Sequence, residues 1–232
     1  MSLADLLRDL VIANRILAHE GVVDAYGHIS VRHPERSDRF FLSGSRSPEL
    51  VTLGDIIEYD LDCNPIDLRE RTQYTERPIH GAIYRKRPDV KAIVHTHAPY
   101  ASALAATGTP LKTIHMDSAM LHGTAHLPEW PGVPVADDEG RIISGALGSA
   151  KTILLANHGL LAAGASIEEA TYLAVFFERA ARMQIRAMAA GGFKEVKTEL
   201  AEEARTFLLQ PSIVRGTFAY WARRSQPTRQ ST

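Results

Sequence analysis

The chain has 232 residues, of which 45% are hydrophobic and 23% are charged, and its formal net charge at pH 7 is -1. This composition is typical of a globular domain, and such a balanced charge supplies no field that would attract nucleic acid or an anionic membrane. The single cysteine, Cys63, excludes an intrachain disulfide and a zinc cage built from thiolates. We therefore expect a single domain over residues 1–232 with no nucleic-acid or membrane partner.

The N-terminal leucines are interrupted by charged residues, including Asp5, Arg8 and Asp9. This segment lacks the continuous apolar core of a signal peptide. The chain also lacks a run of about 18 uncharged apolar residues, the length that a membrane span needs. Together with the lone cysteine, these features predict a cytoplasmic protein.

Hydrophobic periodicity predicts alternating helices and strands. An amphipathic helix opens the chain, with leucines at helical spacing and Ser2 as its capping residue. Strands are expected at 24–31, 39–42, 58–61, 92–97 and 152–156. Further helices are expected at 75–87, 99–104, 166–191 and 195–209.

Three local features of the sequence predict specific structure. Thr75 is predicted to cap the second helix through its hydroxyl. Residues 123–140 are rich in proline and glycine, and they are predicted to form an irregular surface excursion near the site. The last few residues, rich in Ser, Gln, Thr and Arg, are predicted to be disordered.

Three histidines stand at the ends of apolar runs. His95 and His97 follow one run two residues apart, and strand periodicity points both rings to the same side. His158 follows another run, and Gly159 predicts a turn that presents its ring at a strand end. Three neutral imidazoles would form an open zinc or manganese site. Each histidine taken alone is equally compatible with a polar strand edge, so the interpretation depends on the combination.

Glu76 is the candidate acid or base beside these histidines. It stands at the start of a predicted helix, where the helix dipole favours a carboxylate. The alternative is that Glu76 only complements that dipole. His80 follows one helical turn later, and it is predicted to hold the Glu76 side chain in position without contacting the metal or the substrate itself.

Thr75-Glu76-(x)3-His80, His95-Thr96-His97 and Asn157-His158-Gly159, in this order, resemble the class II aldolase/adducin superfamily. The resemblance covers a core of about residues 3–205 and leaves 206–232 as a C-terminal tail. It implies an α/β protein, a three-layer α/β/α fold with a central, mainly antiparallel sheet. It also implies a homotetramer with sites at subunit interfaces.

The resemblance assigns roles to the motif residues. His95, His97 and His158 would hold one divalent metal ion per subunit, Zn²⁺ or Mn²⁺, with Co²⁺ or Fe²⁺ as alternatives. Glu76 would be the catalytic carboxylate, which also approaches the metal and moves a proton to or from an enolate carbon.

Departures from the sugar-phosphate aldolases indicate another substrate. Those aldolases carry asparagine where this chain has His28, and two serines where it has Tyr74-Thr75. They also donate a proton from a tyrosine where this chain has Met116. The residues predicted to bind substrate, as a planar carboxylate in place of phosphate, are His28, Ser43, Gly44, Ser45, Tyr74, Thr75 and, in the wall contributed by a neighbouring subunit, His115.

The Gly-His-Ile-Ser sequence at 27–30 resembles the decarboxylase branch of the superfamily, which acts on hydroxylated pyridine or benzene dicarboxylates. This resemblance implies a divalent-metal-dependent carbon–carbon lyase that decarboxylates a hydroxylated aromatic or heteroaromatic acid through a metal-stabilised enolate. One alternative is a class II aldolase that cleaves a sugar phosphate or a hydroxy-keto acid. A second alternative is a non-catalytic, adducin-like interaction module. For an enzyme, the expected partner is a small-molecule carboxylate or hydroxy-carbonyl compound.

Overall fold

The computed structural model describes residues 2–130, 132 and 137–226, and within them it forms a sheet in the strand order β3-β2-β1-β4-β7-β6-β5. The strands are β1 (His28–Arg32), β2 (Arg39–Ser43), β3 (Ile56–Asp60), β4 (Ala92–Thr96), β5 (Ala125–Leu127), β6 (Thr152–Leu155) and β7 (Gly159–Gly164). Neighbouring strands pair antiparallel, except that β5 pairs parallel with β6. The expected mainly antiparallel sheet is therefore confirmed.

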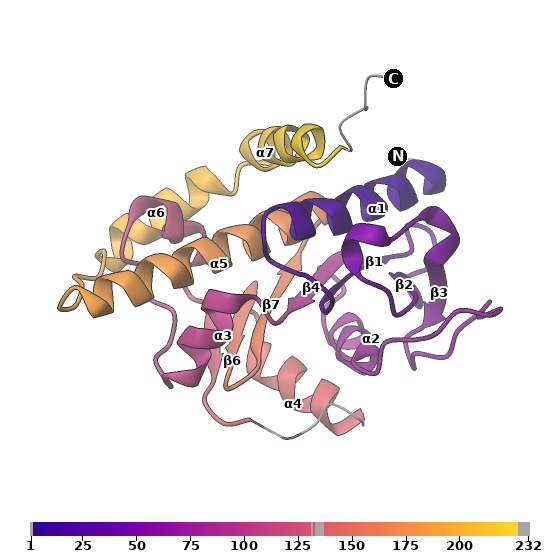
Figure 1. Ribbon diagram of the computed structural model, residues 1–232, viewed down its shortest axis with the longest axis horizontal. Helices are drawn as coiled ribbons and strands as arrows, with labels where there is room; N and C mark the ends of the chain where they lie inside the picture. Colours follow the sequence, from indigo (N-terminus) through magenta and orange to yellow (C-terminus); the bar gives the residue numbers. More distant parts are fainter. Residues whose placement is uncertain (1, 131, 133–136, 227–232) are drawn as a thin grey trace.

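Helices cover both faces of this sheet. The α-helices are α1 (Leu3–His19), α2 (Arg77–Lys86), α3 (Pro99–Ala106), α4 (Asp137–Leu147), α5 (Ile167–Ala189), α6 (Thr198–Leu208) and α7 (Pro211–Arg224). Short 3-10 turns are η1 (Pro48–Leu50), η2 (Leu53–Asp55) and η3 (Met116–Leu121). Helices α1, α5 and α7 lie on one side of the sheet, and α2 and α4 lie on the other (Figure 1). This arrangement confirms the three-layer α/β/α fold.

The two faces of the sheet form separate hydrophobic clusters because strand side chains alternate. On β4, Ala92 and Val94 belong to the cluster under α1 and α5, whereas Ile93 belongs to the cluster under α2 and α4. Because both faces of β4 are buried, its residues 92–94 are all apolar and do not alternate with polar residues. None of the helices in the described ranges combines the length and apolarity that a bilayer crossing needs.

The two predicted helix caps have different outcomes. At α1 the Ser2 hydroxyl accepts the Asp5 N–H at 3.1 Å, which confirms the predicted cap. At α2 the predicted Thr75 cap is wrong, because Glu76 occupies the N-cap position and makes no side-chain capping bond. Pro78 stands at the second helical position, and it has no N–H that a cap could bind.

The prediction that 123–140 is irregular is wrong within the described residues. β5 pairs with β6 through Ala125 opposite Ile153, and α4 begins at Asp137. Strand pairing satisfies the backbone of β5 from a distant segment, which local proline content does not reveal. The remaining part of this stretch, residues 131 and 133–136, and the expected disorder at the end of the chain lie outside the described residues.

The turn between β6 and β7 brings His158 against β4. This confirms the predicted turn at the strand end, but Asn157 adopts its left-handed conformation, with φ 52°, so the role given to Gly159 in the turn is wrong. Gly159 already belongs to β7, where an added Cβ would lie 2.1 Å from the carbonyl oxygen of Thr96. Glycine is thus required for close approach of two strands rather than for a positive φ.

The start of α3, just after His97, is held by a buried carboxylate from α5. Glu178 accepts the N–H groups of Tyr100 and Ala101, both at 2.8 Å. These amides have no partners within the helix, and an anion there complements the helix dipole. Glu178 therefore fixes the backbone that follows His97.

Glu178→Gln should lower the free energy of unfolding by about 1–3 kcal/mol, because one buried N–H would face an amide donor in place of an acceptor. Urea denaturation measures this loss. Glu203→Gln on the exposed face of α6 is the matched control. Equal unfolding midpoints for the two variants would contradict the assignment.

Gly159→Ala should force β7 away from β4, since its Cβ would overlap the Thr96 oxygen. We expect a loss of about 1–3 kcal/mol in stability, as for other overpacked sites. Gly216→Ala adds a Cβ that meets no heavy atom within 4 Å, so its unfolding midpoint should not fall. A Gly159→Ala variant as stable as wild type would refute the close-approach argument.

Candidate metal and proton-transfer site

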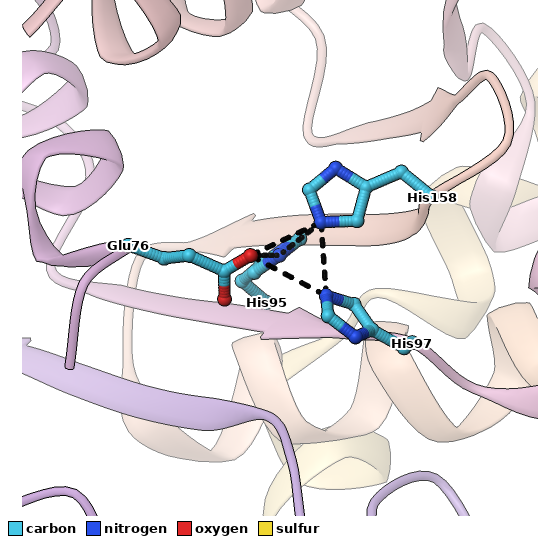
Figure 2. Close-up of side chains that lie close together, drawn as sticks. All are labelled: Glu76, His95, His97 and His158. Carbon is cyan, nitrogen blue, oxygen red and sulfur yellow. Dashed lines mark hydrogen bonds and ion pairs between the residues drawn. The ribbon is translucent and has the colours of Figure 1, made fainter. Parts of the chain in front are cut away.

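Glu76, His95, His97 and His158 converge at one end of the sheet (Figure 2). One ligand atom from each lies within 4.8 Å of the others. Nε2 of His158 is 2.9 Å from Nε2 of His97 and 3.2 Å from Nε2 of His95. Oε1 of Glu76 is 3.2 Å from Nε2 of His158. His95 lies on β4 and His97 just after it, His158 lies in the turn before β7, and Glu76 is the N-cap residue of α2.

The three histidines direct their Nε2 atoms at a common centre. His95 Nδ1 donates to the carbonyl oxygen of Leu160 at 3.0 Å, so the Nε2 atom of a neutral His95 carries the lone pair. Burial lowers the pKa of His95 and of His158, which favours the neutral imidazole that a metal ion binds. Facing Nε2 atoms at these distances suit a divalent cation between them better than a set of shared protons. The donor set therefore fits a divalent metal ion.

Glu76 is held as a carboxylate. Burial alone favours the neutral acid, but attraction to His95 and hydrogen bonds from His158 and His28 outweigh it, so the pKa of Glu76 lies well below its usual value. Oε2 of Glu76 faces Nε2 of His28 at 3.2 Å. The two oxygens thus have separate partners, one among the three converging histidines and one at His28.

A cavity of about 750 Å³ opens over this cluster. Among the predicted substrate-binding residues, the ones that line it are His28, Ser45, Tyr74 and Thr75. Ser43 and Gly44 are buried and are not among its lining residues. His115 lies at the start of η3, also outside the lining, and its predicted contact across a subunit interface stays a prediction.

The loop that resembles an anion-binding loop already uses its backbone donors. The N–H of Gly44 donates to the carbonyl oxygen of Asp55 at 2.7 Å, and that of Ser45 donates to the carbonyl oxygen of Thr72 at 2.9 Å. Tyr74 closes the same region, since its hydroxyl donates to the Arg46 carbonyl at 2.5 Å. A phosphate group would find neither of these two amides free.

His80 contacts Glu76 only through His28. Its Nε2 lies 2.8 Å from Nδ1 of His28, and both rings are buried. Helical spacing alone predicts a direct contact between residues four apart, but the Glu76 side chain points toward the histidines at the end of the sheet (Figure 2).

The structure adds two residues that the sequence analysis did not select. Arg46 is the single arginine or lysine among the described residues that line the cavity. Glu139 on α4 is buried, and its Oε1 is 3.8 Å from Nδ1 of His158. Burial, followed by the nearby charge of Glu76, raises the pKa of Glu139 to about 7. Neither residue belongs to a motif in the chain, so proximity in the fold is the only signal.

Proteins named as decarboxylases are similar to this chain in sequence. The chain is 32% identical over 210 residues to decarboxylase tropJ of Talaromyces stipitatus, covering 78% of this chain and 76% of that protein. It is 32% identical over 199 residues to a 3,4-dihydroxyphthalate decarboxylase of Arthrobacter keyseri, covering 79% of each.

A solved structure, L-fuculose 1-phosphate aldolase from Glaciozyma antarctica PI12, superimposes with a TM-score of 0.85 at 29% identity. The match covers 96% of this chain and 88% of the aldolase. Residues 8–185 match the family described as Class II Aldolase and Adducin N-terminal domain. The chain therefore belongs to the class II aldolase and adducin N-terminal domain family.

Proposed function

We propose that this protein is a divalent-metal-dependent lyase that removes a carboxyl group from a hydroxylated aromatic or heteroaromatic acid. The observation that carries the proposal is the juxtaposition of three imidazoles and the Glu76 carboxylate beneath an open cavity. Relatives named as decarboxylases, 32% identical to this chain, support the carboxy-lyase class.

His95, His97 and His158 would hold the metal ion, zinc or manganese. When bound, such an ion acts as a Lewis acid that stabilises negative charge on a substrate oxygen. Three protein ligands leave coordination positions open toward the cavity. Glu139 Oε1 lies 3.8 Å from the remote nitrogen of His158, which is beyond hydrogen-bond distance, and a carboxylate that moved closer there would orient the ligating imidazole.

Residues that line the cavity would bind the substrate. Arg46 supplies a guanidinium whose Nη1 already pairs with Oδ1 of Asp55 at 3.2 Å, so its other nitrogens would bind the substrate carboxylate. Tyr74 and Trp130 add aromatic surface for a flat ring. Because the Gly44 and Ser45 amides are already bonded, the cavity suits a carboxylate better than a phosphate.

Glu76 would move the proton. As a carboxylate it can accept the proton of the hydroxyl next to the departing carboxyl group and deliver it to the ring carbon that bears that group. The ring carbon then has four single bonds and the former hydroxyl carbon carries a carbonyl. The bond to the carboxylate breaks, carbon dioxide leaves, and the released electron pair restores the aromatic ring and the phenolate. Glu76 ends as a carboxylate, ready for another cycle.

Retro-aldol cleavage is the competing activity. The similarity to L-fuculose 1-phosphate aldolase keeps it open. It requires an acid for the departing aldehyde, but Met116 occupies the position of the usual tyrosine and is exposed outside the cavity lining. An interaction module without catalysis would have no need for the converging histidines and Glu76. A homotetramer, in which His115 reaches a neighbouring cavity, also remains a proposal.

His97→Ala should abolish stoichiometric metal binding, since it removes one of three imidazoles while leaving the buried His95 in place. Metal content is measured by mass spectrometry on protein purified without chelator. His19→Ala, an exposed histidine at the end of α1, is the control and should keep the metal. Unchanged metal content in His97→Ala would refute the ligand assignment.

Wild-type protein with zinc or manganese should release carbon dioxide from at least one member of a panel of ortho-hydroxy aromatic carboxylic acids. Glu76→Gln should keep its metal and lose turnover by about 10²–10⁴-fold, because it cannot carry the proton. Glu203→Gln should behave as wild type. Cleavage of a sugar phosphate with no carbon dioxide from any acid would overturn the decarboxylase proposal in favour of an aldolase.

A further inference from the structure

A chain of hydrogen bonds runs from Glu76 into the protein interior. Oε2 of Glu76 is 3.2 Å from Nε2 of His28, and Nδ1 of His28 is 2.8 Å from Nε2 of His80. Nδ1 of His80 is 2.6 Å from Oγ of Ser30, which is 2.8 Å from the hydroxyl of Tyr84. His28, His80, Ser30 and Tyr84 are each at most 1% exposed.

Two regular elements build this chain. His28 and Ser30 stand two apart on β1 and therefore share a face of the strand. His80 and Tyr84 stand four apart on α2 and therefore share a face of the helix. The strand and helix face each other, so their side chains alternate along the path to Glu76.

Tyr84, at the interior end of this series of hydrogen bonds, decides which atom of each pair is the donor. Burial raises the pKa of Tyr84, so the phenol keeps its proton. Among the described residues its hydroxyl bonds only to Ser30, so it must donate to Ser30. The Ser30 hydroxyl then donates to Nδ1 of His80, whose remaining proton is on Nε2 and goes to Nδ1 of His28. His28 is left with its proton on Nε2, directed at the Glu76 carboxylate.

Exchanging donor and acceptor in every one of these hydrogen bonds would be unfavourable both at Tyr84 and at Glu76. It would leave the buried Tyr84 hydroxyl proton without an acceptor. It would also turn the lone pair of His28 Nε2 toward the negative Oε2 of Glu76. Both penalties select the same arrangement.

We propose that Tyr84, Ser30 and His80 are positioning residues that fix His28 as the Nε2–H tautomer, so that it donates to Oε2 of Glu76. Oε1 is then left facing His95, His97 and His158. Tyr84, Ser30 and His80, which do not line the cavity, thereby set the orientation of the Glu76 carboxylate that transfers the proton. The effect on turnover depends on the proposed function, whereas the tautomers of His28 and His80 do not.

The tautomers can be read directly from ¹⁵N chemical shifts of histidine-labelled, chelator-treated full-length protein. We expect Nε2–H for both His28 and His80, with the signals assigned by loss in His28→Gln and His80→Gln. Tyr84→Phe removes only the terminal hydroxyl and should shift the His80 signals toward a mixture of tautomers. Finding Nδ1–H at either ring in wild type would overturn the proposal, as would wild-type signals in Tyr84→Phe.

Steady-state kinetics on the metal-loaded enzyme test the effect of these positioning residues on turnover. Tyr84→Phe and Ser30→Ala should lower kcat by about 10–100-fold with a smaller change in KM, as for other outer partners of a catalytic group. Tyr59→Phe is the matched control, because Tyr59 is fully buried but its hydroxyl has no hydrogen-bond partner among the described residues. Equal kcat in Tyr84→Phe and Tyr59→Phe would refute the positioning role. If no acid is decarboxylated, the tautomer measurement still decides the proposal.

Discussion

The position of β4 between β1 and β7 is the constraint on which the site depends. His28 lies opposite His95 across the β1–β4 pair, and Thr96 lies opposite Leu160 across the β4–β7 pair. Because Gly159 has no Cβ, the turn before β7 closes onto the end of β4. A shift of either register by one residue would turn His95 to the other face and separate the histidines.

This arrangement places a carboxylate among imidazoles in a largely buried setting. Such a cluster is costly without a partner of opposite charge, because the electrostatic interactions of buried groups are poorly screened. A divalent cation would satisfy both the imidazole lone pairs and the Glu76 charge. The same low screening gives weight to the hydrogen bond from His28, since it acts on the carboxylate with little competition from water.

The fold and the chemistry are separable in this family. The backbone superimposes on that of an aldolase, and the features on which the proposed substrate depends are local: His28, Tyr74 and the bonded amides of residues 44–45. A scaffold that delivers three histidines and a glutamate to one end of a sheet can serve more than one lyase reaction by changing the cavity wall.

What the sequence determined by itself was local. The strand period placed His95 and His97 on one side, and the order of motifs indicated the family, because side-chain direction within one element follows from backbone geometry alone.

Tertiary structure alone decided the rest. It placed Glu139 and Arg46 at the site, paired β5 with β6, made Gly159 a point of close approach and linked Tyr84 to Glu76 through three intervening side chains. Each of these depends on segments far apart in the chain, whose separation in space no local pattern of residues encodes.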